Sequence, residues 1–278
     1  MGKRAKGPIG RKNLKASTYK LIDLHCHILP GIDDGPRTTE ESLLMATKAV
    51  EDGIHTIVAT PHTLNGVYLN TVHEISSRLD SLRDVLSRSH INLRLPIGSD
   101  CHLCPQILKK IDSGDAVTIN NDRKYILIEL PSQSIPPLAK DEIFNLKLNG
   151  ITPIITHPER NVIIQHDIQI LYDFVSMGAL SQVTAMSIVG DFGDSARHCA
   201  EMMLRYQLVH IIASDAHSFD RRPPVLSPAV EAAAEILGNY EEAERMVTEV
   251  PGAILLGDRV ECPEPIRSRR GPGYLTMA

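Results

Sequence analysis

The sequence of 278 residues has no tryptophan, few aromatic side chains and an odd number of cysteines. Because aromatic residues make up only 4% of the chain, aliphatic side chains must fill its core. Five cysteines without regular spacing argue against a disulfide framework, so we expect reduced thiols and a cytoplasmic protein. The length and the 42% hydrophobic content are those of an ordinary globular protein with one large α/β domain.

The sequence also has no apolar run of the length needed to span a membrane, and its basic start has no apolar segment of the signal-peptide type. Residues 1–20 carry seven Lys or Arg and no acid, whereas the remainder has 22 basic and 34 acidic residues. A body this acidic argues against nucleic acid as a partner. We predict a disordered basic extension over 1–20, one domain over 21–256 and a tail over 257–278.

Short β-branched runs alternate with helical periodicity along the whole chain, which predicts a parallel sheet with helices in the crossovers. Seven strands with polar residues at one end suggest a closed barrel. The predicted strands are 20–25, 54–60, 92–98, 125–130, 151–156, 180–184 and 208–214. The predicted helices are 38–52, 70–90, 104–112, 137–149, 167–178, 194–206, 227–237 and 240–248.

Nearly every predicted strand is followed by residues that bind metals. Because the carboxyl ends of parallel strands meet at one face, these side chains should converge there. The first motif, His25-x-His27, places two imidazoles on one side of a strand. The candidate ligands are His25, His27, Asp34, His62, Asp100, Glu129, His157, Asp215 and His217. A nitrogen and oxygen set without thiolate suits up to three Mn, Fe, Zn, Mg or Co ions, which activate water and bind phosphoryl oxygens.

Two arginines at the same predicted rim favour a phosphate ligand. Arg160 lies three residues beyond His157, and Arg222 follows the last ligand pair. Guanidinium groups bind phosphate through two parallel hydrogen bonds and stay charged. The alternative for each is a solvated surface arginine.

Two further motifs give weaker indications of a function. His198-Cys199 and Arg205 have the spacing of a cysteine-based phosphatase loop, but the residues between them are strong helix formers without glycine. We therefore expect Cys199 on a helix. The pair Cys101 and Cys104 lacks the second pair that a zinc ribbon needs.

The motifs together resemble the polymerase-and-histidinol-phosphatase (PHP) superfamily, and within it the bacterial capsule and exopolysaccharide protein-tyrosine phosphatases. The resemblance runs from about Leu21 to Leu256. The supporting stretches are Ile22-Asp23-Leu24-His25-Cys26-His27-Ile28-Leu29-Pro30-Gly31-Ile32-Asp33-Asp34-Gly35, Ala59-Thr60-Pro61-His62, Ile126-Leu127-Ile128-Glu129, Thr156-His157-Pro158-Glu159-Arg160, and Ala213-Ser214-Asp215-Ala216-His217 with Arg222-Pro223-Pro224.

The resemblance implies an α/β fold, a distorted (β/α)7 barrel of the PHP type with a centre of two or three divalent ions, manganese being favoured. It implies that one ion is held by His25, His27, Asp100 and Asp215, a second by Asp100, Glu129 and His157, and a third by Asp34, His62 and His217. The family usually has Glu where this chain has Asp100, a side chain one CH₂ shorter.

For the reaction, the resemblance implies hydrolysis of phosphotyrosine, on a tyrosine kinase that controls polysaccharide synthesis. Arg160 would be the catalytic phosphate-binding residue, with Arg222 assisting and His217 able to donate a proton. Three alternatives stay open from the sequence. They are a small-molecule phosphatase of the histidinol-phosphatase type, a nuclease or polymerase-associated domain, and a non-catalytic metal-stabilised binding domain.

Overall fold

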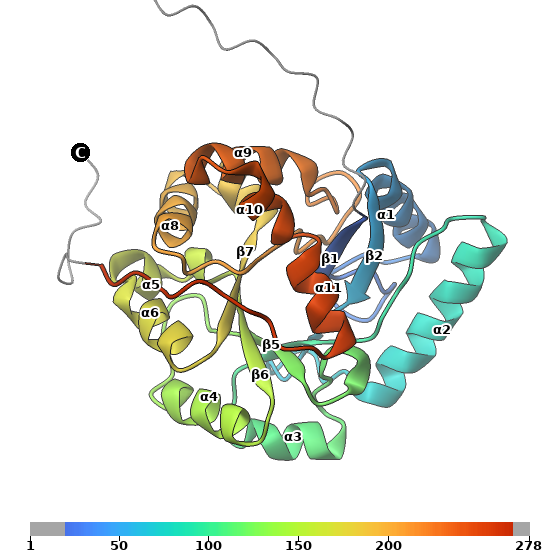
Figure 1. Ribbon diagram of the computed structural model, residues 1–278. Helices are drawn as coiled ribbons and strands as arrows, with labels where there is room; N and C mark the ends of the chain where they lie inside the picture. The colour runs from blue at the N-terminus through green and yellow to red at the C-terminus, as the bar shows by residue number, and fades with distance from the viewer. Residues whose placement is uncertain (1–19, 269–278) are drawn as a thin grey trace, which may run out of the picture.

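In the computed structural model, which describes residues 20–268, strands and helices alternate around a ring with the helices outside (Figure 1). The predicted α/β fold is confirmed. The strands are β1 (Leu21–Cys26), β2 (Ile54–Ala59), β3 (His62–Thr63), β4 (Asp100–His102), β5 (Tyr125–Glu129), β6 (Thr152–Thr156), β7 (Leu180–Thr184) and β8 (Ile211–Ala213).

The helices of the described part occur in the predicted order, and short helices that were not predicted are added to them. They are α1 (Thr39–Glu51), α2 (Val72–Arg88), α3 (Ile107–Ser113), α4 (Ala139–Leu148), α5 (Val162–His166), α6 (Gln169–Ser176), α7 (Ala185–Val189), α8 (Asp194–Arg205), α9 (Ser227–Leu237), α10 (Tyr240–Arg245) and α11 (Glu249–Leu256). Two 3₁₀ turns complete them, η1 (Ile119–Asn121) and η2 (Pro158–Arg160).

All the strands pair in parallel, β1 with β2 and β3 through β8 in chain order. The two seams between these sheets are joined by isolated bridges. Cys26 bridges Ala216 on one side, and on the other side Thr56 bridges Arg94 and Ala59 bridges Ile97. A distorted ring of strands therefore replaces a regular barrel.

The strand predicted over 92–98 is wrong in its position. The structure has isolated bridges at Arg94 and Ile97, and the regular strand starts only at Asp100. Pro96 explains the difference, because proline has no N–H to donate to a ladder. Its carbonyl oxygen still accepts a hydrogen bond from Ala59 N at 2.9 Å, which keeps the segment beside β2.

The strands are buried on both faces, as expected of a parallel sheet covered by helices. Alternate residues of β5 show this, because Leu127 points into a small inner cluster whereas Ile126 and Ile128 join the larger cluster under the helices. The inner cluster also contains Val250 and Ile254 from α11, a helix absent from the sequence prediction. Figure 1 shows α11 lying across the ring of strands.

Beyond α11, residues 257–268 contain no regular element but remain attached to the domain. Val260 and Cys262 pack against the inner cluster, and the Ile266 N–H donates to the Tyr206 carbonyl at 2.8 Å. Residues 1–19, most of the predicted basic extension, and residues 269–278 of the predicted tail lie outside the described residues. No helix within 20–268 is long and apolar enough to cross a bilayer.

Stability should fall in acid because of His210, at the start of β8. Its side chain is buried, its Nδ1 accepts a hydrogen bond from Ser181 N at 3.1 Å, and burial lowers its pKa to about 4 from an ordinary 6.5. The unfolded chain therefore binds this proton at higher pH than the folded one does. The stabilisation is complete above about pH 7 and is lost between about pH 6.5 and 4, by about 3 kcal/mol.

The measurement is the free energy of unfolding at several pH values for the wild type and His210→Gln, whose amide oxygen can accept the same hydrogen bond. Groups shared by both proteins cancel in the difference. We expect the pH dependence to be weaker in the variant. Parallel curves from pH 7 to 4 would contradict this account of His210.

Candidate metal centre and phosphate site

A cavity of about 270 Å³ opens at the carboxyl ends of the strands, the face at which β/α barrels build their sites. Its lining residues include Asp34, His62, Glu129, His157, Arg160, Asp215, His217 and Arg222. His25, His27 and Asp100 lie below it and are fully buried. The structure thus brings together every residue that the sequence singled out for this site.

Unusual backbone conformations at two strand ends help to point these side chains inward. His157, after β6, has φ +36°, and Asp215, after β8, has φ +50°. Non-glycine residues rarely adopt this left-handed region, and those that do cluster at functional sites. Asp215 is held there by its N–H, which donates to the His25 carbonyl oxygen at 2.8 Å.

The deepest group of candidate ligands contains His25, His27, Asp100 and Asp215. The Nε2 atoms of the two histidines are 3.2 Å apart. Asp215 Oδ1 lies 3.4 Å from each of them, and Asp100 Oδ2 lies 3.6 Å from His25 Nε2. These four residues are the set that the sequence prediction gave to the first ion.

Asp100 also belongs to a second group, with His62 and Glu129. Its Oδ2 lies 3.3 Å from His62 Nδ1, which is itself 3.6 Å from Glu129 Oε2. His157 Nε2 is 3.7 Å from the other oxygen of Glu129. The shorter aspartate side chain therefore still reaches between the two groups.

The third group joins Asp34 to three histidines, His27, His62 and His217. Asp34 Oδ1 lies 3.6 Å from His62 Nε2 and 3.4 Å from His217 Nε2. His62 thus faces the second group with one ring nitrogen and the third with the other, whereas the sequence prediction placed it in the third alone.

The chemistry of these residues fits divalent cations. Asp100 Oδ2 and His62 Nδ1 are buried, and although they lie 3.3 Å apart, neither makes a hydrogen bond within residues 20–268. Burial holds the pKa of His25 below its ordinary value and, together with Arg160, that of His157 well below it, so both rings stay neutral and can bind a metal. At His27, the effect of burial is outweighed by the carboxylates of Asp33 and Asp215, which raise the pKa of the ring to about 10. These two carboxylates therefore favour a positive charge at this place in the site.

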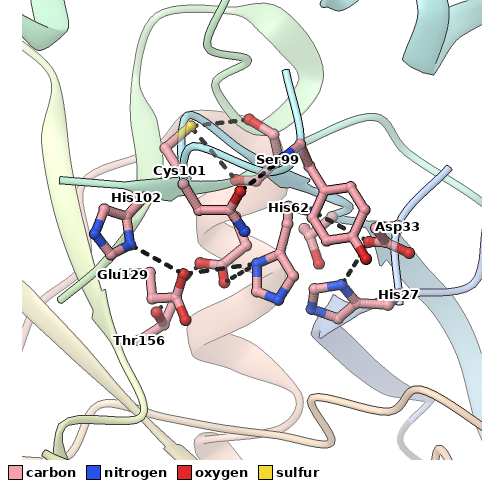
Figure 2. Close-up of polar contacts among 12 residues, drawn as sticks. His27, Asp33, His62, Ser99, Cys101, His102, Glu129 and Thr156 are labelled. Atoms are coloured by element: carbon pink, nitrogen blue, oxygen red, sulfur yellow. Dashed lines mark hydrogen bonds and ion pairs between the residues drawn. The ribbon is translucent and has the colours of Figure 1, made fainter. Parts of the chain in front are cut away.

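Three residues that the sequence analysis did not assign orient the candidate ligands. The Asp33 carboxylate lies 2.7 Å from His27 Nδ1, and Gln182 Oε1 lies 2.8 Å from His25 Nδ1 (Figure 2 shows the first pair). Each contact leaves the Nε2 atom free to face the centre. His102, also in Figure 2, lies 3.4 Å from Glu129 Oε2. Asp33 appeared in the sequence analysis only within the first supporting stretch, whereas Gln182 lies in no motif identified there.

The two arginines meet on Asp215. The Nη2 atoms of Arg160 and Arg222 donate to Asp215 Oδ2 at 2.5 and 2.7 Å, while the other oxygen faces His25 and His27. One carboxylate thus separates the histidine cluster from two guanidinium groups that line the same cavity. A phosphoryl group in this cavity would face the two guanidinium groups and the candidate metal ligands together.

Cys199 lies away from this site on α8, as the sequence predicts. Its side chain is buried, burial raises the pKa of its thiol, and Arg205 pairs with Glu201 on the same helix.

We expect Cys199→Ser to keep phosphatase activity within about threefold, because only a thiolate in a phosphate loop would act as nucleophile. Steady-state kinetics at equal metal content measures this. An inactive but folded variant would overturn the assignment.

Known proteins are similar to this chain in sequence and in fold. The family described as capsular polysaccharide synthesis, CpsB/CapC, matches residues 21–256. The chain belongs to this family. It is 34% identical over 256 residues to the tyrosine-protein phosphatase YwqE of Bacillus subtilis, covering 91% of this chain and 100% of that protein. It is 36% identical over 224 residues to CapC of Staphylococcus aureus, covering 81% and 87%.

A solved structure supports the same placement. It comes from a study of the crystal structures of YwqE and of CpsB from Streptococcus pneumoniae, which are described there as metal-dependent tyrosine phosphatases. The match has a TM-score of 0.86 and 33% sequence identity, and it covers 90% of this chain and 100% of the other. A histidinol phosphate phosphatase from Lactococcus lactis, 11% identical with a TM-score of 0.50, shares the fold alone and covers 79% of this chain and 93% of that one. The predicted family and its phosphatase class are confirmed.

Proposed function

We propose that this CpsB/CapC family member is a metal-dependent protein-tyrosine phosphatase. The observation that carries the proposal is the position of Asp215, with one oxygen toward the histidine cluster and the other toward Arg160 and Arg222. A phosphomonoester needs this pairing of cations with phosphate-binding guanidinium groups. The names of the relatives select tyrosine phosphate among such esters.

We assign the nine candidate ligands to two or three divalent ions, with manganese as the proposed metal. When bound, such ions lower the pKa of water and neutralise charge on phosphoryl oxygens. Asp33 and Gln182 keep His27 and His25 in fixed ring orientations for that purpose. Asp100 is the proposed bridge, since its Oδ2 lies near both His25 and His62.

Arg160 and Arg222 would bind the non-bridging phosphoryl oxygens and stabilise the charge that spreads over them in the transition state. Their shared contact with Asp215 keeps the two side chains beside the candidate metal ligands before substrate arrives. The substrate's oxygens would replace part of this contact.

For His217, the geometry favours a role as ligand over a role as proton donor. Its Nδ1 lies 2.9 Å from the Asp215 carbonyl oxygen, which accepts the ring proton and leaves Nε2 with a lone pair toward Asp34. Burial followed by His27 lowers its pKa to about 4, so the ring is neutral at pH 7. A tyrosyl group with a pKa of about 10 needs little protonation to leave.

The proposed physiological substrate is a phosphotyrosine protein of the capsule or exopolysaccharide system, a bacterial tyrosine kinase, in the cytoplasm. The test compares a phosphotyrosine peptide, p-nitrophenyl phosphate and histidinol phosphate as substrates, each after chelation and after Mn²⁺ is restored. We expect Mn²⁺-dependent hydrolysis with the peptide preferred. A preference for histidinol phosphate, or full activity in a metal-free preparation, would reject the proposal.

A further inference from the structure

An aromatic ring lies against both arginines of the proposed phosphate site. Phe192, one of only four phenylalanines in the chain, is half-buried in the turn between α7 and α8. The guanidinium carbon of Arg160 lies 5.0 Å from the centre of its ring, and that of Arg222 lies 5.5 Å from it. Both distances are within the range of a cation–π contact.

Hydrogen bonds alone hold these guanidinium groups incompletely. Each group donates through Nη2 to Asp215, while the Nε atoms of both arginines are buried without a hydrogen-bond partner among residues 20–268. The two cations also repel each other, because they converge on one carboxylate oxygen. The negative face of an aromatic ring offers the additional contact that a planar guanidinium accepts.

A buried side chain next to Arg160 ties η2 to the segment that leads to the ring. Oε1 of Glu159, the neighbour of Arg160 in η2, accepts hydrogen bonds from Ser187 Oγ of α7 at 2.7 Å and from Thr184 N at the end of β7 at 3.1 Å. Gly190 and Gly193, with φ of +100° and +89°, turn the chain on either side of Phe192. A side chain in this turn is therefore held close to the rim rather than on a long loop.

We propose that Phe192 is a positioning residue that holds the guanidinium groups of Arg160 and Arg222 side by side, ready to bind a phosphoryl group. This inference rests on the proposed phosphatase function. Because the ring acts through the arginines, its effect extends to every phosphoryl ligand, whatever the leaving group. A ring that contacted the tyrosyl group of the substrate directly would affect aryl esters alone.

The test compares Phe192→Leu, which removes the ring, with Phe192→Tyr, which keeps it. Phe144→Leu is the matched control, since Phe144 is exposed on α4. Calorimetry measures inorganic phosphate binding to each Mn²⁺-loaded protein. We expect Phe192→Leu to weaken phosphate binding about three- to tenfold, as loss of a cation–π contact implies. Phe192→Tyr and Phe144→Leu should bind as the wild type does, with metal content and Tm unchanged in all three.

Kinetics with an aryl and an alkyl phosphomonoester extend the test. For Phe192→Leu we expect kcat/KM to fall by the same factor for both esters. In an Arg222→Gln background the loss caused by Phe192→Leu should shrink, because one of the two positioned groups is gone.

Unchanged phosphate binding in Phe192→Leu, an equal defect in Phe192→Tyr, or a loss confined to the aryl ester would each overturn the inference. A wild-type protein that binds phosphate but hydrolyses no phosphomonoester would instead reject the proposed function. The phosphate-binding comparison would still decide the role of Phe192 in that case.

Discussion

His25→Ala should lower kcat by more than about 10²-fold, the upper figure for losing a residue that merely supports a metal ligand. His25 is fully buried, and its Nε2 lies within 3.6 Å of His27, Asp100 and Asp215. Its removal would leave an ion bound there with one ligand fewer. Bound metal should fall together with activity.

Elemental analysis of the purified protein, kinetics on p-nitrophenyl phosphate and circular dichroism give the three measurements needed. His198→Ala is the control, because His198 is exposed on α8 and should tolerate the change. We expect His157→Ala to behave as His25→Ala does, since His157 lies beside Glu129 in the second group. Full activity and metal content in a folded His25→Ala protein would remove His25 from the proposed ligand set.

Arg160→Ala should lower kcat by about 10² to 10³-fold while the bound metal stays unchanged, the loss expected when a donor to transition-state charge is removed. The side chain lines the cavity, and its hydrogen bond goes to the Asp215 oxygen that faces away from the histidines. Arg160→Lys should recover little, because a lysine ammonium cannot form two parallel hydrogen bonds to phosphate.

The control for this arginine is Arg205→Ala, on α8, whose partner Glu201 is one helical turn away. It should be as active as the wild type. Kinetics and elemental analysis on the same preparations separate binding of phosphate from binding of metal. If Arg160→Ala loses its metal, the arginine serves to hold Asp215 in place, and its assignment to the phosphate is wrong.

The strand that the sequence placed at 92–98 shows where periodicity reaches its limit. Short β-branched apolar runs predicted β5, β6 and β7 within one residue of their bounds, because these strands are continuous and buried on both faces. Pro96 interrupts the fourth strand, and only the contacts with β2 show how the backbone is satisfied around it. The two seams of the ring depend on isolated bridges that no local pattern predicts.

The sequence by itself determined which residues meet. Each strand end carries its own polar side chain, and parallel strands bring their carboxyl ends to one face, so the candidate ligands and both arginines were identifiable before any distance was known. The same reasoning placed Cys199 on a helix.

Only the tertiary structure decided how these residues are grouped. His62 faces two groups at once, Asp100 is shared despite its shorter side chain, and Gln182 and Phe192 contact the site from positions without a recognisable motif. The physical reason is that these contacts depend on strand register, on where the ring of strands closes and on the tightness of single turns. Such quantities arise from packing between segments far apart in the chain, which the local order of residues does not specify.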